Sequence, residues 1–215
     1  MSLTPLIIYG AGGFGREIAC LVHAINQIEP RWSLLGFIDD GLAVGTENEY
    51  GTVLGDITTL QGINEPTALV IAIASPQIIE KLTRKITNPN IWFPNIIAPD
   101  VLFFDQNSFK TGNGNIITFS CRISCNITLG DFNILNGQVS LGHDVKLGSY
   151  NVLMPETRIS GESHIGNSNF FGVRSLVLQG IKIGNNTRIG AASVVMRNTK
   201  NNSLYIGNPA KKTEI

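Results

Sequence analysis

The sequence predicts two domains of different classes, an α/β domain followed by an all-β domain built as a parallel β-helix. Strand-like and helix-like segments alternate through roughly the first ninety residues. An apolar residue then recurs at every sixth position from Ile117 to Val195. Glycine occurs 23 times and only 15% of the residues are charged, a composition typical of turn-rich β structure. We place the boundary between residues 95 and 96.

The first domain is expected to contain a small parallel sheet. Strands are predicted at residues 6–9, 34–38 and 69–74, and helices at 14–26 and 77–86. The apolar residues of the first helix fall on one face, at Ile18, Leu21, Val22 and Ile25. Buried strands that alternate with helices predict a parallel sheet covered on both faces.

The second domain shows a period of six residues. Fourteen consecutive positions in one register are apolar: Ile117, Ile123, Leu129, Leu135, Leu141, Leu147, Leu153, Ile159, Ile165, Phe171, Val177, Ile183, Ile189 and Val195. At 43% apolar content this run arises by chance about once in 10^5 trials. The next position is glycine at 130, 142, 148, 166, 172, 184 and 190, which suits corners where a side chain would obstruct the backbone. A repeat this short buries its apolar residue only by stacking on the rungs above and below, so it predicts a β-helix.

The charge balance and the cysteines exclude several classes of protein. Sixteen basic residues balance sixteen acidic ones, so neither a nucleic acid nor a membrane surface is expected as a partner. No window is apolar enough to span a bilayer, and the start MSLTPLIIYG lacks the basic region of a secretory signal, so a cytoplasmic location is expected. Cys20, Cys121 and Cys125 form neither an even disulfide set nor a metal pattern, and we expect all three to be buried.

The order of motifs resembles that of a known enzyme family. GAGGFG (Gly10–Gly15) follows the first strand and FIDD (Phe37–Asp40) ends the second; an alanine-rich strand, LGHDV (Leu141–Val145) in the hexads and IGNPAKK (Ile206–Lys212) follow. This order is similar to that of the hexapeptide-repeat nucleotide-sugar acetyltransferases of the PglD and NeuD type. The resemblance implies a Rossmann-like nucleotide-sugar-binding domain at residues 1–95. It also implies a left-handed β-helix acyltransferase domain with a C-terminal tail at 96–215, with three hexads per coil and four to five coils.

The glycine-rich turn is the first candidate binding site. Glycines between a strand and a helix let a phosphate approach the backbone near the free N–H groups of the helix N-terminus. A tight turn without a ligand is the alternative. The resemblance implies that the turn holds the diphosphate and nucleoside of a sugar nucleotide through Gly10, Gly12, Gly13, Phe14 and Gly15.

Two carboxylates follow the second strand. The resemblance places Asp39 and Asp40 near the ribose or base, and a solvated turn is the alternative for each. After the third strand relatives continue with a Gly-Asp pair or similar, whereas this chain has Ala74, Ser75 and Pro76. That departure leaves the identity of the nucleotide open.

LGHDV holds the candidate catalytic pair. Leu141 is expected to point inward and Gly142 to form the corner, so His143 and Asp144 lie outside the apolar core. Imidazole accepts a proton near neutral pH, and a carboxylate on Nδ1–H leaves Nε2 as the base. A solvated histidine is the more common outcome for an isolated His-Asp pair. The resemblance implies that His143 is the base and that Asp144 orients its ring.

Gly161 and the other histidines have less specific signals. Gly161 matches a family glycine whose N–H faces the thioester oxyanion, and an ordinary corner glycine is the alternative. His164 and His23 are expected to be solvated or structural. Some relatives carry a second histidine where this chain has Val152. Because only two histidines lie in the repeats, a carbonic-anhydrase-like metal site is disfavoured and no metal is expected.

The resemblance implies acetyl-CoA as co-substrate, bound between the subunits of a homotrimer. Gly172, Val173, Gly190 and Ala191 are expected to border its pantetheine arm. Pro209 belongs to the matching tail, and Lys211 is expected to reach the CoA phosphates, unless the lysines there only solubilise the tail.

The expected function is acetyl-CoA-dependent N-acetylation of a nucleotide-linked amino sugar, a UDP- or dTDP-linked amino-deoxy sugar. The resemblance implies a role in surface polysaccharide or glycan biosynthesis and direct attack in a ternary complex. Two alternatives stay open at this point: O-acetylation of a sugar hydroxyl, sialic acid included, and a non-catalytic hexapeptide scaffold.

Overall fold

The computed structural model describes residues 3–213. The chain forms two compact units, and the main division falls between Pro99 and Asp100. The strand Ile96–Ile97, however, already pairs within a sheet of the β-helix that forms the second unit. We therefore keep residues 1–95 and 96–215 as the proposed limits of the domains. No helix within the described residues is both long and apolar enough to cross a bilayer.

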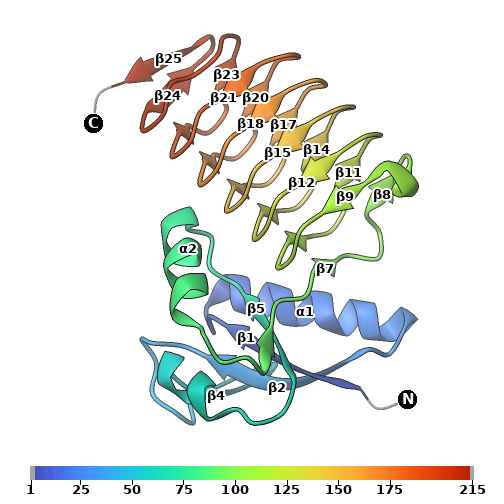
Figure 1. Cartoon of the computed structure of the whole chain (residues 1–215), viewed down its shortest axis with the longest axis vertical. Helices are drawn as coiled ribbons and strands as arrows, with labels where there is room; N and C mark the ends of the chain where they lie inside the picture. Colours follow the sequence, from blue (N-terminus) through green and yellow to red (C-terminus); the bar gives the residue numbers. More distant parts are fainter. Residues whose placement is uncertain (1–2, 214–215) are drawn as a thin grey trace. The chain divides into compact units, whose positions relative to one another are not determined.

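The first unit is a mostly parallel sheet with two α-helices (Figure 1). Its elements are β1 (Thr4–Tyr9), α1 (Gly13–Ile28), β2 (Trp32–Ile38), β3 (Glu47–Asn48), β4 (Gly51–Gly55), the 3-10 helix η1 (Ile57–Gly62), β5 (Thr67–Ile71), α2 (Pro76–Lys85) and β6 (Ile91–Trp92). The strand order is β3-β4-β2-β1-β5-β6, and only β3 and β4 are antiparallel. The three predicted strands and two predicted helices are confirmed.

The position of β1 fixes where a ligand can bind in this sheet. The chain passes from β1 to β2 on one side and later returns to β5 on the other side of β1. Ligands of open parallel sheets bind at the carboxyl ends of the strands next to such a change of direction. The turns that follow β1, β2 and β5 therefore gather at the edge where a ligand is expected.

The second unit is a β-helix of two-residue strands. They are β7 (Ile96–Ile97), β8 (Leu102–Phe103), β9 (Lys110–Thr111), β10 (Ile116–Ile117), β11 (Arg122–Ile123), β12 (Thr128–Leu129), β13 (Ile134–Leu135), β14 (Ser140–Leu141), β15 (Lys146–Leu147), β16 (Val152–Leu153), β17 (Arg158–Ile159), β18 (His164–Ile165), β19 (Phe170–Phe171), β20 (Leu176–Val177), β21 (Lys182–Ile183), β22 (Arg188–Ile189) and β23 (Val194–Val195). A 3-10 turn, η2 (Gln106–Ser108), precedes β9, and the longer strands β24 (Leu204–Gly207) and β25 (Ala210–Thr213) close the chain as an antiparallel hairpin.

Three sheets form the walls of the β-helix (Figure 1). The first sheet runs from β7 through β10, β13, β16, β19 and β22 to the hairpin; the second contains β8, β11, β14, β17, β20 and β23; the third contains β9, β12, β15, β18 and β21. Each repeat strand pairs in parallel with the third strand after it, so Ile123 pairs with Leu141, 18 residues later. The predicted three hexads per coil are confirmed. The fourteen strands β10 to β23 make 14/3 coils, between four and five.

The inward column and the corner glycines behave as predicted. All fourteen residues of the apolar register are at most 4% exposed. A Cβ atom added to Gly142 would lie 2.5 Å from the backbone nitrogen of Gly161 in the next coil, and one added to Gly172 would lie 2.5 Å from that of Ala191. Close stacking of the coils therefore requires glycine there. The left-handed backbone falls at other positions, mostly on non-glycine residues such as Asp144 with φ 60°, and on Gly114 and Gly180.

A ladder of asparagines lies inside one corner of the β-helix. Asn115, Asn133, Asn151 and Asn169 are at most 1% exposed. The backbone N–H and side-chain Nδ2 of Asn151 both donate to Asn133 Oδ1, over 2.9 and 3.0 Å. The same two groups of Asn169 donate to Asn151 Oδ1, over 3.0 and 2.9 Å. Throughout residues 3–213, no buried side-chain nitrogen or oxygen lacks a hydrogen-bond partner.

Candidate active site

His143 and Asp144 form a hydrogen-bonded pair at a corner of the β-helix. The strand β14 ends at Leu141, which points into the core, and the turn then presents both polar side chains outward. His143 Nδ1 lies 2.8 Å from Asp144 Oδ2, and the two side chains are 47% and 49% exposed. If Nδ1 carries the proton, it donates to the carboxylate and Nε2 has a free lone pair. The geometry therefore suits the predicted pair of a base and its orienting carboxylate.

Asn126 holds the other oxygen of this carboxylate, which the sequence analysis did not anticipate. Its Nδ2 donates to Asp144 Oδ1 over 3.1 Å. Asn126 precedes Asp144 by 18 residues, so it occupies the same place in the preceding coil. The hydrogen bond from His143, followed by the one from Asn126, lowers the pKa of Asp144 below its usual range. The carboxylate that faces the imidazole therefore stays ionised at neutral and mildly acidic pH.

Gly161 lies in the next coil, 18 residues after His143, and the imidazole packs directly over it. A Cβ atom built on Gly161 would lie 2.5 Å from His143 Nε2 and 2.7 Å from its Cε1. The backbone of Gly161 is outside the left-handed region, so no conformational need for glycine exists here. Glycine at this position provides the space in which the ring of His143 lies.

The backbone N–H of Gly161 is available to a ligand. At the corner that follows the third sheet, side chains one coil later accept such N–H groups: Ser149 Oγ accepts from Asp131 and Asn167 Oδ1 accepts from Ser149. Gly161 has no side chain that could accept the N–H of His143 in this way. Within residues 3–213 no acceptor meets the N–H of Gly161 itself. A donor beside the imidazole is what an oxyanion site requires.

We expect Gly161→Ala to lower kcat by roughly 10- to 100-fold with little change in the melting temperature, because the methyl group displaces the imidazole from Asp144. The measurement is the steady-state rate together with thermal unfolding. Gly137→Ala is the matched control in the coil of His143, because its Cβ would meet nothing closer than 3.9 Å. Equal losses in the two variants would contradict the steric explanation.

The glycine-rich turn after β1 leaves open backbone at the N-terminus of α1. Gly10 has a φ of 104°, and a Cβ on Gly15 would lie only 1.8 Å from Gly10 O, so both glycines serve the tight packing of α1 on the turn. Gly12 and Gly13, in contrast, face open space with no atom within 4 Å of an added Cβ. Gly12 caps α1 without a side-chain hydrogen bond, and Phe14 is half-buried in its first turn. Open backbone at a helix N-terminus is suited to bind an anion.

Asp39 and Asp40 both support this edge of the sheet. Asp39 Oδ2 accepts from the backbone N–H of Ala11 over 2.9 Å and so fixes the glycine-rich turn. Asp40 Oδ2 accepts from the Tyr9 hydroxyl over 2.7 Å. Burial and these carboxylates raise the pKa of Tyr9. Each carboxylate thus has a structural partner, and contact with a ribose or base stays a prediction.

The predicted cofactor residues of the hexads share one groove. Gly172, Val173, Gly190 and Ala191 line a cavity of about 530 Å³ together with Ile206 of the C-terminal hairpin. In the hairpin Lys211 pairs opposite Ile206, so both lie on the same face, whereas Pro209 lies in the turn. The groove borders the edge where β20 and β23 of the second sheet begin. His143 lies at the opposite edge of this sheet, where β14 ends.

The remaining cysteines and histidines stand apart from this site. Cys121 is buried, and burial raises the pKa of its thiol to about 12, so it is an inert core residue. The prediction that Cys20 is buried is wrong, because it lies off the apolar face of α1 and donates from Sγ to the Tyr50 hydroxyl over 3.0 Å. Cys125 is half-buried. His164 is exposed, as is His23, which contacts the ring of Tyr50.

Metal-ligating side chains do not gather anywhere in the described part of the chain. No group of three or more histidine, cysteine, aspartate or glutamate side chains is arranged there to hold an ion.

Comparison with known proteins connects this geometry to a family. The profile of the PglD N-terminal domain matches residues 5–86. No curated protein matches the chain. A histidine-to-asparagine variant of perosamine N-acetyltransferase from Caulobacter crescentus, solved with CoA and GDP-perosamine, is 25% identical with a TM-score of 0.86, over 100% of this chain and 99% of that one. WeeI from Acinetobacter baumannii AYE is 25% identical with a TM-score of 0.87, over 98% of this chain and 100% of that one.

A third similar structure extends the likeness of the fold. The acetyltransferase domain of PglB from Neisseria gonorrhoeae FA1090, solved with acetyl coenzyme A, has a TM-score of 0.89 over 99% of this chain and 100% of that one, at 23% identity. The predicted fold class is confirmed: a Rossmann-like domain followed by a left-handed β-helix. With this architecture over its whole length and a PglD N-terminal domain at residues 5–86, the chain is an acyltransferase that resembles the hexapeptide-repeat enzymes of the PglD and NeuD type.

Proposed function

We propose that the protein is an acetyl-CoA-dependent N-acetyltransferase that acts on the amino group of a nucleotide-linked amino sugar. The observation that carries the proposal is the pair at the β-helix corner, in which Asp144 engages Nδ1 of His143 and Nε2 lies over Gly161. The perosamine N-acetyltransferase of Caulobacter crescentus, solved with CoA and a GDP-linked sugar, supports this reading of the substrate class.

The proposed step is a direct transfer. His143 Nε2 removes a proton from the sugar amine as its nitrogen attacks the thioester carbonyl, and Asp144 stabilises the imidazolium that forms. The N–H of Gly161 donates to the oxyanion of the tetrahedral intermediate. When the C–S bond breaks, the acetyl group stays on the sugar nitrogen as an amide. The CoA sulfur takes up the proton from His143 Nε2, so that CoA is released as the thiol.

Acetyl-CoA is proposed to lie along the groove of Gly172, Val173, Gly190 and Ala191, with Lys211 near its phosphates. Small residues permit close approach of the pantetheine arm, and the basic side chains at the hairpin suit phosphate groups. Since this groove and His143 lie at opposite edges of the second sheet, one chain alone does not bring them together. This separation supports a homotrimer in which the groove of one copy meets His143 of another.

The sugar nucleotide is proposed to bind the first domain through its nucleoside and diphosphate. Gly12 and Gly13 leave the backbone open for the diphosphate, with Gly10, Phe14 and Gly15 shaping the turn. Asp39 and Asp40 lie next to this turn and are proposed to accept hydrogen bonds from the ribose or base.

The test is release of free CoA from acetyl-CoA with a panel of UDP-, dTDP- and GDP-linked amino sugars. Release with one 3-amino or 4-amino sugar, and none with the matching 3-hydroxy or 4-hydroxy sugar, is the expected result. Release that depends on a hydroxyl would replace the proposal with O-acetylation. If acetyl-CoA binds and no member of either set is acetylated, the chain is a scaffold without this chemistry.

A further inference from the structure

We propose that Asn126 is a positioning residue of the candidate active site and acts on His143 through Asp144. Its Nδ2 donates to Asp144 Oδ1 over 3.1 Å from the preceding coil. The other oxygen of the carboxylate, Oδ2, lies 2.8 Å from His143 Nδ1. The inference rests on the proposed function for the reaction that the imidazole performs, whereas the hydrogen bonds are features of the chain itself.

The carboxylate of Asp144 needs a second partner because the catalytic pair is open to water. The side chains of His143 and Asp144 are 47% and 49% exposed, so water competes for the contact between them. Rotation about the Cβ–Cγ bond of Asp144 would carry Oδ2 away from Nδ1. A donor on Oδ1 resists this rotation, because the movement would break both hydrogen bonds together. Asn126 therefore keeps Oδ2 directed at the imidazole.

Asn126 is itself held by the coil below it. Its backbone N–H donates to Ser108 Oγ over 2.8 Å, and the Ser108 hydroxyl donates to the carbonyl oxygen of Asp105 over 3.1 Å. The backbone of Asn126 is left-handed, with φ 57°, a conformation that asparagine adopts more readily than most residues. Ser108, Asn126 and Asp144 thus form a connected series over three successive coils, and the series ends at His143.

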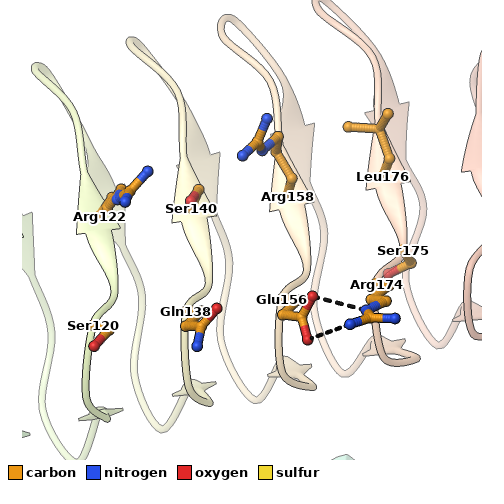
Figure 2. Close-up of a pocket in the computed structure, with 9 residues that line it drawn as sticks. All are labelled: Ser120, Arg122, Gln138, Ser140, Glu156, Arg158, Arg174, Ser175 and Leu176. Atoms are coloured by element: carbon orange, nitrogen blue, oxygen red, sulfur yellow. Dashed lines mark hydrogen bonds and ion pairs between the residues drawn. The ribbon is translucent and has the colours of Figure 1, made fainter.

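The same arrangement at another corner shows that such residues face each other along the stack. Glu156 and Arg174 also lie 18 residues apart with left-handed backbones, φ 63° and 60°. The Nε and Nη2 of Arg174 donate to the two carboxylate oxygens of Glu156 over 2.8 and 3.2 Å (Figure 2). In that pair the cation holds both oxygens. Asn126 holds only one oxygen of Asp144 and leaves the other to the imidazole.

Asn126 has no substitute among the neighbouring side chains. The hydrogen bond from His143, followed by the one from Asn126, lowers the pKa of Asp144, and the charge of Lys146 adds a smaller effect. Within residues 3–213, Lys146 forms no salt bridge with Asp144, and no third side chain donates to this carboxylate. An ionised carboxylate only accepts hydrogen bonds, so the amide must present its Nδ2. Without this amide, only water would hold Oδ1.

The test uses Asn126→Gly and Asn126→Asp in the full chain. Both residues tolerate the left-handed backbone; glycine removes the donor, and aspartate replaces it with an acceptor of the same shape. Nitrogen NMR of the imidazole rings at mildly alkaline pH reports which ring nitrogen of His143 carries the proton. His143→Ala identifies its signals among those of the three histidines. We expect the proton on Nδ1 in the wild type and a shift of the population toward Nε2–H in both variants.

Turnover is expected to follow the tautomer. With the sugar identified by the panel, kcat is expected to fall about 3- to 10-fold in Asn126→Gly and at least about tenfold in Asn126→Asp, where the two carboxylates repel each other. The dissociation constant of acetyl-CoA and the melting temperature are expected to stay at the wild-type values. Loss of kcat alone distinguishes a positioning role from a structural one.

Asn186→Gly is the matched control. Asn186 is an exposed asparagine of the same β-helix, and its backbone is also left-handed, with φ 51°. It follows β21 of the third sheet, whereas His143 follows β14 of the second. The same substitution there is expected to change neither the tautomer of His143 nor kcat.

Two results would overturn the proposal. A wild-type tautomer in both variants would show that Asp144 holds the ring without Asn126. A lower melting temperature and weaker acetyl-CoA binding, with an unchanged tautomer, would show that Asn126 only joins the coils. The tautomer is measured without substrate, so a tautomer that depends on Asn126, with no CoA release from any sugar, would reject the proposed function and leave the positioning of His143 standing.

Discussion

Replacing His143 with alanine is expected to lower kcat by about 10^2- to 10^4-fold, the range that a positioned general base contributes. The loss is expected in the chemical step, because without His143 no base removes the proton of the amine as its nitrogen attacks the thioester carbonyl. The imidazole lies on the surface at a corner, 47% exposed, so its removal leaves the apolar column intact. The measurements are kcat with the sugar identified by the panel and the dissociation constant of acetyl-CoA, which is expected to stay near the wild-type value.

His164→Ala is the matched control for this prediction. His164 is an exposed histidine of the same β-helix, on β18 of the third sheet, and within residues 3–213 no acidic side chain pairs with its ring. Its replacement is expected to leave kcat unchanged. Turnover near the wild-type rate in His143→Ala would show that another group removes the proton, and equal losses in both variants would point to general damage to the β-helix.

The apolar column was predictable because the core of a β-helix is periodic in the sequence. Each inward residue recurs after six positions and stacks on the residue 18 positions later, as Ile123 does on Leu141. Corner glycines were predictable for a related reason, since a side chain at Gly142 would collide with the next coil. One strict repeat thus determines the fold of the second unit.

The surroundings of His143 were less accessible to sequence analysis. Asp144 is adjacent in the chain and was found, but Asn126 touches the pair from one coil below. Gly161 was assigned a role by resemblance, while its packing against the imidazole emerged from the structure. Once the coil length is 18 residues, the positions 18 before Asp144 and 18 after His143 give Asn126 and Gly161 directly. The 18-residue period thus relates polar neighbours in adjacent coils as well as the residues of the apolar column.

The asparagine ladder was not predictable from the period of six residues. Asn133, Asn151 and Asn169 recur every 18 residues, three times the apolar period, so the hexad register does not reveal them. Their side chains are fully buried, and each satisfies the next. Burial of an amide costs free energy unless the amide is hydrogen-bonded. This corner is therefore stable only when every asparagine of the ladder is hydrogen-bonded.

Replacing Asn151 with alanine is therefore expected to lower the free energy of unfolding by roughly 2 to 6 kcal/mol. The change removes the oxygen that accepts from both the backbone N–H and the Nδ2 of Asn169, leaving two buried donors at about 1–3 kcal/mol each. It also opens a small cavity in the corner. The measurement is chemical denaturation with urea, in which a lower midpoint at constant slope reports the loss of stability.

Asn167→Ala separates this effect from the loss of an asparagine as such. Asn167 also accepts a backbone N–H across coils, from Ser149 over 2.7 Å, but it lies exposed on the outside of the β-helix. Water replaces its oxygen there, so the cost is expected to stay below about 0.5 kcal/mol. If Asn151→Ala unfolds at the same urea concentration as Asn167→Ala, the buried ladder does not stabilise the stack, and the apolar column alone holds the coils together.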